Sequence, residues 1–139
     1  AQHLQDSLNR AKFLLAFSTS VSPAPYTHPT KEYITGRWTD ALASGVTVVG
    51  KVPNTTTVRE ILWDGATIDI DHADARAGLA QVADAVSRWT PAQGEQQIRQ
   101  ALQHLDWRHR FVQLCEAMGE VPASLAADCE AMRAQYVQR

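Results

Sequence analysis

The chain has 139 residues, of which 45% are hydrophobic and 20% are charged, and its formal net charge is −2. This composition excludes a disordered chain and predicts one soluble domain, residues 1–139, that is large enough to bury a core. The apolar runs are far shorter than the ~20 residues that cross a bilayer, and lysine and arginine form no basic stripe, so neither a transmembrane segment nor a nucleic-acid partner is expected.

The chain begins with a helical pattern followed by a strand pattern. Residues 2–11 carry leucines at helical spacing and predict an amphipathic helix that a sheet must cover. Residues 12–18, KFLLAFS, predict a strand buried on both faces of a parallel sheet. Ligands of open α/β sheets bind outside the carboxyl ends of the strands, so Ser18 and Thr19 are candidate binding residues, with an ordinary turn as the alternative. Since the chain lacks an initiator Met and opens within a helix pattern, we expect a fragment or a mature domain.

The stretch 32–50 contains the most informative pattern of the chain. It predicts a helix over residues 36–44, ended by Gly45, and a buried apolar strand over residues 46–49. Thr35 is the expected N-cap. Free backbone N–H groups and the positive end of the helix dipole would then face a ligand, and such a helix end suits a phosphate.

Charged residues flank this helix start. Arg37 adds a planar fork of donors, and Gly36 lets the backbone approach an anion closely. Glu32 and Asp40 place carboxylates eight residues apart on either side of the turn. A nucleotide sugar offers partners for both kinds of group, because it carries a diphosphate and hydroxyls.

These residues resemble the E-x(7)-E block of GT-B glycosyltransferases, which is commonly Glu-Gly-Phe-Gly, three residues, then Glu-Ala-x-Ala-x-Gly and an apolar strand. Arg37, three residues before Asp40, is similar to the R-x-x-E form of the group 1, spore-coat-like branch. Asp40 stands where the family has its second Glu. The segment Tyr33-Ile34-Thr35-Gly36 keeps one glycine of the Gly-Phe-Gly. In element order the resemblance covers roughly residues 4–118.

The resemblance implies a Rossmann-like α/β parallel sheet flanked by helices, one half of a GT-B fold, that binds a nucleoside-diphosphate sugar as donor without a cofactor or metal. By this resemblance, Asp40 would bind the ribose, Gly36 and Arg37 would bind the diphosphate, and Glu32 would lie near the donor sugar. Glu32 and Arg37 are therefore the candidate catalytic residues. An N-terminal GT-B domain, missing from this chain, would bind the acceptor. The candidate substrate-binding residues are Ser18, Thr19, Tyr33, Ile34, Thr35, Gly36, Arg37, Asp40 and Lys51.

A polar loop and an acidic cluster follow the second strand. Residues 50–57 include Lys51, a candidate charge for the ligand. The loop also contains Asn54 and three threonines, which could bind a phosphate or base or, alternatively, form a turn and cap a short segment over residues 58–62. Residues 67–70 predict a third strand near an edge of the sheet. The acidic and histidine side chains that follow could ligate a metal, but helix capping also explains them. They are Asp69, Asp71, His72 and Asp74.

The rest of the chain predicts four helices: residues 75–89, one beginning at Thr90, one capped by Asp106, and one after Pro122. Their apolar stripes are expected to form core rather than cofactor sites. The whole chain thus predicts an α/β part over residues 1–105 and a helical tail over 106–139. The stripe residues are Leu79, Val82, Ala83, Val86, Ile98, Leu102, Leu105, Phe111, Leu114, Cys115, Met118, Leu125, Cys129, Met132 and Tyr136.

Three functions fit these patterns. The first is the donor-binding domain of a glycosyltransferase, inactive as an isolated chain, and the second is a nucleotide- or sugar-phosphate-binding module without catalysis. The third is a structural α/β domain in which Arg37 and Asp40 form a solvated helix pair. Cys115 and Cys129 are expected to be reduced, which indicates a cytoplasmic protein.

Overall fold

The computed structural model describes residues 2–18, 21 and 23–137. The chain forms two compact units, Ala1–Ile98 and Arg99–Arg139. The first contains the sheet and its helices, and the second is helical. That the chain is a single domain with a tail from residue 106 stays a prediction.

The first unit is built on a three-stranded parallel sheet with strand order β1-β2-β3. The strands are β1 (Phe13–Leu15), β2 (Thr47–Gly50) and β3 (Thr67–Asp69), and Val48 pairs with residues of both neighbours. The predicted α/β class, the parallel sheet and the edge position of the third strand are therefore confirmed.

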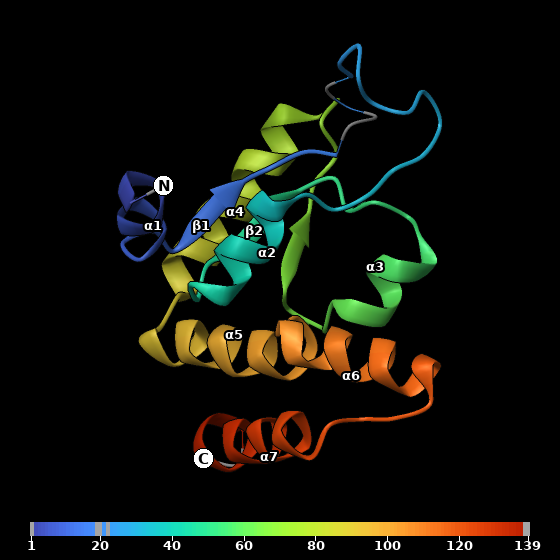
Figure 1. Ribbon diagram of the computed structural model, residues 1–139. Coiled ribbons are helices and arrows are strands. Elements are labelled where there is room, and N and C mark those ends of the chain that lie inside the picture. The colour runs from blue at the N-terminus through green and yellow to red at the C-terminus, as the bar shows by residue number, and fades with distance from the viewer. Residues whose placement is uncertain (1, 19–20, 22, 138–139) are drawn as a thin grey trace. The chain divides into compact units, whose positions relative to one another are not determined.

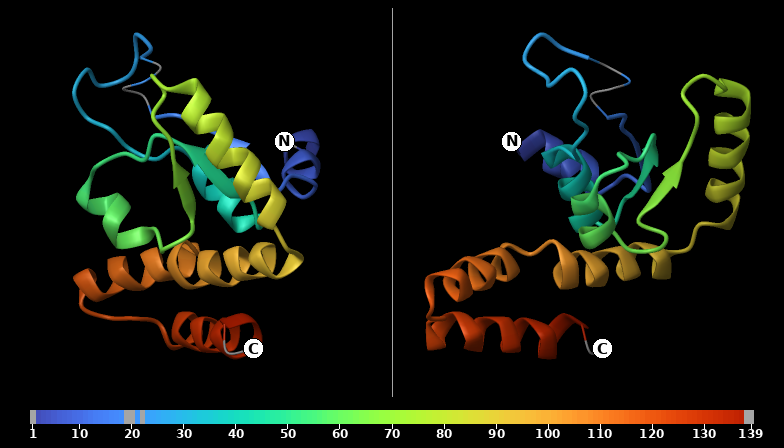
Figure 2. Two further views of the ribbon diagram at one scale, coloured as in Figure 1. Left: turned by 180° about the vertical axis from the view of Figure 1, so that it is seen from behind. Right: turned by 90° about the vertical axis from the view of Figure 1, so that its right-hand side faces the viewer.

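Helices α1 (Gln2–Leu8) and α2 (Gly36–Ala43) lie on one side of the strands, and α4 (Ala75–Arg88) lies on the other (Figure 1; Figure 2, right). The short helix α3 (Thr56–Ile61) connects β2 to β3. The first helix ends three residues earlier than its pattern predicts, and of its leucines Leu8 is buried whereas Leu4 is exposed.

The core of this unit lies between α2 and β2. Trp38, Leu42 and Val48 are almost completely buried. Gly45 ends α2 with φ 81°, and the amides of residues 45 and 46 donate to the carbonyls of residues 42 and 41. This is a Schellman motif, in which glycine avoids the Cβ clash of the left-handed conformation. The predicted helix, its glycine stop and the strand that follows are confirmed.

The other face of the sheet is less covered than the sequence predicts. Leu15 is 63% exposed, so the expectation that the first strand is buried on both faces is wrong. On α4, Leu79 is 70% exposed and Val86 is also exposed, so this helix does not bury its apolar stripe on the sheet as predicted. Gly78 is its one buried residue. Periodicity identified the apolar face of the helix, but the helix stands off from the strands.

The second unit contains α6 (Trp107–Met118) and α7 (Ala123–Met132), which ends in a π-helical turn, Arg133–Val137. Helix α5 (Pro91–His104) begins in the first unit and ends in the second. Asp106 caps α6 as predicted, by accepting a hydrogen bond from the amide of Arg108. Gly119, at φ 96°, ends it.

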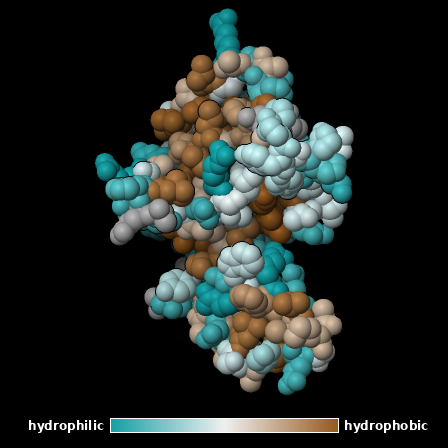
Figure 3. Space-filling model, turned by 45° about the horizontal axis from the view of Figure 1, so that its top comes forward, coloured by the Kyte–Doolittle hydropathy of each residue, from teal (hydrophilic) through white to brown (hydrophobic). Residues whose placement is uncertain are grey.

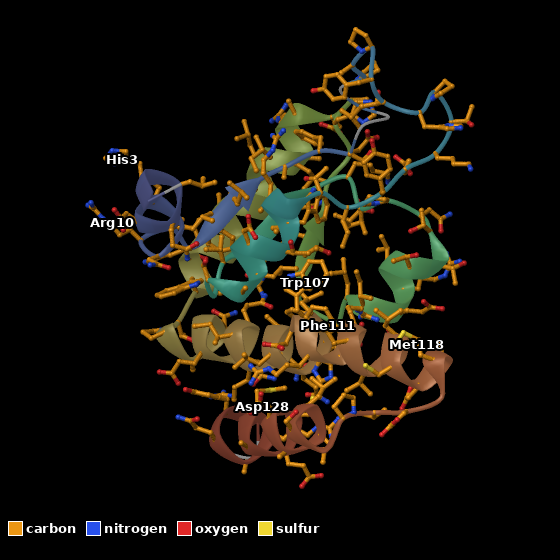
Figure 4. The ribbon with its side chains drawn as sticks, in the orientation of Figure 1. His3, Arg10, Trp107, Phe111, Met118 and Asp128 are labelled. Atoms are coloured by element: carbon orange, nitrogen blue, oxygen red, sulfur yellow. The ribbon has the colours of Figure 1, made fainter. Side chains whose placement is uncertain are left out.

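The apolar stripe of α6 is exposed rather than buried as core. Trp107, Phe111 and Met118 lie on the side of α6 that faces away from α7 (Figure 4), and Leu114 of the same stripe is also exposed. The groove between the two helices is instead lined by the opposite face of α6, including Val112. On α7, Cys129 and Met132 are buried as expected. Over the described part of the chain, no helix has the length and apolarity that a membrane span requires.

Candidate functional site

The predicted site lies at the carboxyl edge of the sheet, where the loops after the parallel strands and the start of α2 meet. Ser18 follows β1, Lys51 follows β2, and the extended segment ending at Thr35 leads into α2 (Figure 1). In this segment Tyr33 is partly exposed and Ile34 is half-buried. Thr19 lies outside the described residues.

Glu32 is held at this edge by the segments that follow two neighbouring strands. The Ser18 hydroxyl donates to Glu32 Oε1 at 2.6 Å, and the backbone N–H of Asn54 donates to Oε2 at 3.4 Å. Ser18 is only 1% exposed, so its hydroxyl orients Glu32 from within the fold. Charge-assisted hydrogen bonds of this kind fix a carboxylate in one orientation.

Asn54 belongs to the polar loop after the second strand, where the sequence predicts its side-chain amide as a possible ligand donor. In the structure its backbone N–H contacts Glu32 instead. Thr55 accepts a hydrogen bond from the Val58 amide, so the capping alternative is confirmed for this residue. The Asn54 side chain accepts from Arg59 and is thereby held in place.

Helix α2 begins with unsatisfied backbone donors. Thr35 occupies the N-cap position with extended backbone angles, as predicted, but its side chain makes no capping hydrogen bond. Its carbonyl accepts from the amide of Trp38. Among the described residues, the amides of Gly36 and Arg37 have no acceptor. Such donors, together with the positive end of the helix dipole, form a site for an anion.

The space in front of Gly36 is open. A Cβ built on this glycine would meet only one atom within 4 Å, Oδ2 of Asp40 at 3.9 Å. The carboxylate of Asp40 therefore stands beside the helix start, and its side chain is exposed. A ligand anion could approach the backbone here, with a hydrogen-bond acceptor next to it.

Arg37 is exposed and forms no ion pair or side-chain hydrogen bond with any residue that the structure describes. In particular, no bond joins Arg37 to Asp40 within the described residues, so the solvated pair of the purely structural hypothesis is not formed. The guanidinium and the carboxylate are both available to a ligand.

Lys51 has a partner within the protein. Its Nζ lies 3.3 Å from Oδ2 of Asp69, the last residue of β3, and the other carboxylate oxygen accepts from the Val52 amide. Both side chains are about half exposed, so the pair is worth at most ~1 kcal/mol and could rearrange. As the structure stands, the charge of Lys51 is used to join the ends of β2 and β3.

The acidic cluster after β3 has structural roles. Asp71 accepts from the amide of Ala73, and Asp74 caps α4 by accepting from the amide of Ala77. The capping alternative is therefore confirmed for Asp74, whereas Asp71 stabilises the turn that precedes the helix. Nowhere in the described ranges do three His, Cys, Asp or Glu side chains gather as metal ligands would.

Shifted pKa values occur in the second unit. The hydrogen bond from Arg108 lowers the pKa of Asp106, and the same bond raises the pKa of Arg108. Burial, followed by the charge of His109, lowers the pKa of His104. Asp106 and Arg108 form the N-cap of α6, and His104 is the last residue of α5.

The carboxyl edge thus offers an available guanidinium, two free amides, an available carboxylate and a second, oriented carboxylate. This set can bind an anion and accept hydrogen bonds from hydroxyls. No protein-family model, curated protein or solved structure matches the chain.

Proposed function

We propose that this chain is the donor-binding domain of a GT-B glycosyltransferase and binds a nucleoside-diphosphate sugar at the start of α2. The observation that carries the proposal is the pair of Arg37 and Asp40, which stand beside an open glycine without partners among the described residues. Exposed opposite charges three residues apart on a helix would normally pair. Their separation leaves one group for a phosphate and one for a hydroxyl.

The diphosphate would bind at the helix start. The amides of Gly36 and Arg37 donate to one phosphate oxygen, and the guanidinium of Arg37 adds a charge-assisted, bidentate contact. Positive charge at this place stabilises the leaving diphosphate during transfer, so the proposed reaction needs no metal. The parallel sheet, with this helix start at its carboxyl edge, supports the Rossmann-like assignment.

Asp40 would bind the ribose. Its carboxylate lies close to Gly36, so a nucleoside attached to the bound diphosphate can reach it. An ionised carboxylate accepts two hydrogen bonds and suits the paired 2′ and 3′ hydroxyls. Glu32, oriented by Ser18 and Asn54, would accept hydrogen bonds from the donor sugar.

A second candidate function is a nucleotide- or sugar-phosphate-binding module without catalysis. Two observations favour it: Asp40 is one methylene shorter than the Glu of the family pattern, and Lys51 is already paired with Asp69. Both functions require the same diphosphate site. They differ in whether a second domain and an acceptor complete a reaction.

Calorimetry with a panel of nucleoside diphosphates tests the shared site. Arg37→Ala should weaken diphosphate binding by about 1.5–3 kcal/mol, roughly 10- to 150-fold, and leave nucleoside binding nearly unchanged. Arg76→Ala is the matched control, because Arg76 is also exposed but lies on α4. Equal affinities of Arg37→Ala and the wild type for the diphosphate would remove Arg37 from the site.

Transfer assays separate the two candidates. In the glycosyltransferase proposal, the 139-residue chain binds the diphosphate but transfers no sugar, because a second domain must exclude water and orient the acceptor. Positioning of this kind contributes up to ~7–11 kcal/mol to lowering a barrier. Adding the second domain should then restore acceptor-dependent transfer. Sustained transfer by the chain alone would contradict the proposal.

A further inference from the structure

An apolar groove of about 440 Å³ lies between α4 and the sheet. Phe13, Leu15 and Phe17 line it from β1 and the segment after it, and Leu79 and Val82 line it from α4. Leu15 and Leu79 are 63% and 70% exposed, so the groove presents large apolar side chains to water. In Figure 3 hydrophobic residues gather on the upper left, where β1 and α4 lie.

Beside the groove, β1 is an edge strand. Among the described residues it pairs with β2 alone, so the backbone groups along its other side are unpaired. Natural edge strands are usually protected by charges, prolines or a covering element. The apolar sequence of β1 and the exposed Leu15 provide no such protection.

The two ends of the groove carry opposite charges. At one end, Asp71 lines the groove and Asp74 lies three residues further on, both exposed. At the other end, the Nζ of Lys12 lies 4.2 Å from the centre of the Trp89 ring, which places the start of β1 beside the end of α4. Lys12 is exposed there and supplies the positive charge, whereas the neighbouring Arg88 is paired with Asp84 of the same helix. The groove thus runs from an acidic end to a basic end.

We propose that this surface, which consists of the free edge of β1, the groove and the exposed face of α4, binds a second copy of the chain. A two-fold axis makes the two β1 strands antiparallel, the orientation in which edge strands pair across a symmetric interface. It also reverses the groove, so the acidic end of one copy meets the basic end of the other. The two sheets then join, and Leu15 and Leu79 of both copies become buried.

Charge complementarity selects this occupant. An unrelated apolar segment would fill the groove without using the charges at its ends. In a symmetric dimer each contact occurs twice, so the acidic end of each copy would face the basic end of the other. The inference does not depend on the proposed function, because the groove and the start of α2 lie on opposite sides of the sheet (Figure 2, right).

Sedimentation velocity over a wide range of protein concentrations tests the proposal. The wild-type chain should show a monomer–dimer equilibrium. Leu79→Glu should raise the dimer dissociation constant by about 30-fold or more, as expected for the loss of a central interface residue. Leu114→Glu is the matched control: it makes the same change at another exposed leucine, on α6, and should leave the dissociation constant unchanged. Circular dichroism checks that both variants fold.

A charge exchange provides an independent test. Lys12→Asp and Asp71→Lys should each weaken the dimer, and the double variant should restore it, because each charge faces its complement on the other copy. A strictly monomeric wild-type chain would overturn the proposal and leave the surface to a different partner. The proposal would also be overturned if Leu114→Glu abolished the dimer and Leu79→Glu did not. A double charge variant that dimerises no more tightly than the single variants would overturn it as well.

Discussion

Gly50→Ala is expected to destabilise the first unit severely. A Cβ at this position would lie 1.7 Å from the carbonyl oxygen of Ala16, well inside the 3.0 Å limit of real contacts, and the opposing atoms are backbone. The segment after β1 must therefore shift, and the hydrogen bond from the Ala16 amide to the Val49 carbonyl is strained or lost. Overpacking of this kind and one backbone hydrogen bond together cost about 2–4 kcal/mol.

The shift should also reach the candidate site, because Ser18 follows Ala16 by two residues and orients Glu32. Chemical denaturation of the full chain measures the stability, and calorimetry measures nucleoside-diphosphate binding. Gly78→Ala is the matched control. Gly78 lies inside α4, and a Cβ there would make an ordinary 3.4 Å contact with the side chain of Ile70. This substitution should leave the free energy of unfolding unchanged or raise it by about 0.5–1 kcal/mol. Equal stabilities of the Gly50→Ala and Gly78→Ala variants would refute the reasoning.

Three further predictions concern the ribose contact, a buried amide and acid stability. Asp40→Asn should weaken ribonucleotide binding more than binding of 2′,3′-dideoxy analogues, as measured by calorimetry, and equal losses would contradict the ribose role. Gln97→Leu should lower the unfolding free energy by about 2–4 kcal/mol, because this 6%-exposed amide bonds to Trp63 Nε1, Thr47 Oγ1 and the Gly65 carbonyl; denaturation midpoints would show it. The pKa values of His104 and Asp106 are lower in the folded state than in the unfolded state, so the unfolded state binds protons more readily. These two groups therefore contribute their whole share of the folding stability at pH values above their unfolded pKa values of 6.5 and 3.8. That stability should be lost as the pH falls through the lowered values, and denaturation midpoints that stay constant on acidification would contradict this.

Local rules predicted the secondary structure well because they act within a few residues. Gly45 and Gly119 both take the left-handed conformation that ends a helix, and Asp74 and Asp106 both cap the helices that they precede. The three strands appear where apolar or β-branched runs predict them, although β1 and β3 are shorter than their patterns and β2 is shifted by one residue.

What covers an apolar stripe could not be predicted, since periodicity defines a face and not its neighbour. Leu79 on α4 and Phe111 on α6 follow helical spacing and are nevertheless exposed. Partners distant in sequence were also missed. Lys51 pairs with Asp69, eighteen residues away, and Glu32 is held by the amide of Asn54, twenty-two residues away. No local pattern encodes such contacts.

The hydrogen bonds across the carboxyl edge have a consequence for the thermodynamics of binding. Glu32 joins the segments after β1 and β2, and Asp69 joins Lys51 and Val52 to the end of β3. Hydrogen bonds from the backbone amides of Asn54 and Val52 orient the carboxylates of Glu32 and Asp69 before a ligand arrives, so these two side chains lose little conformational entropy on binding. In the proposed site, Arg37 is the long side chain that would become fixed, at a cost of about 0.5–1.5 kcal/mol. Binding at this edge should therefore carry a small entropic penalty, concentrated in one side chain.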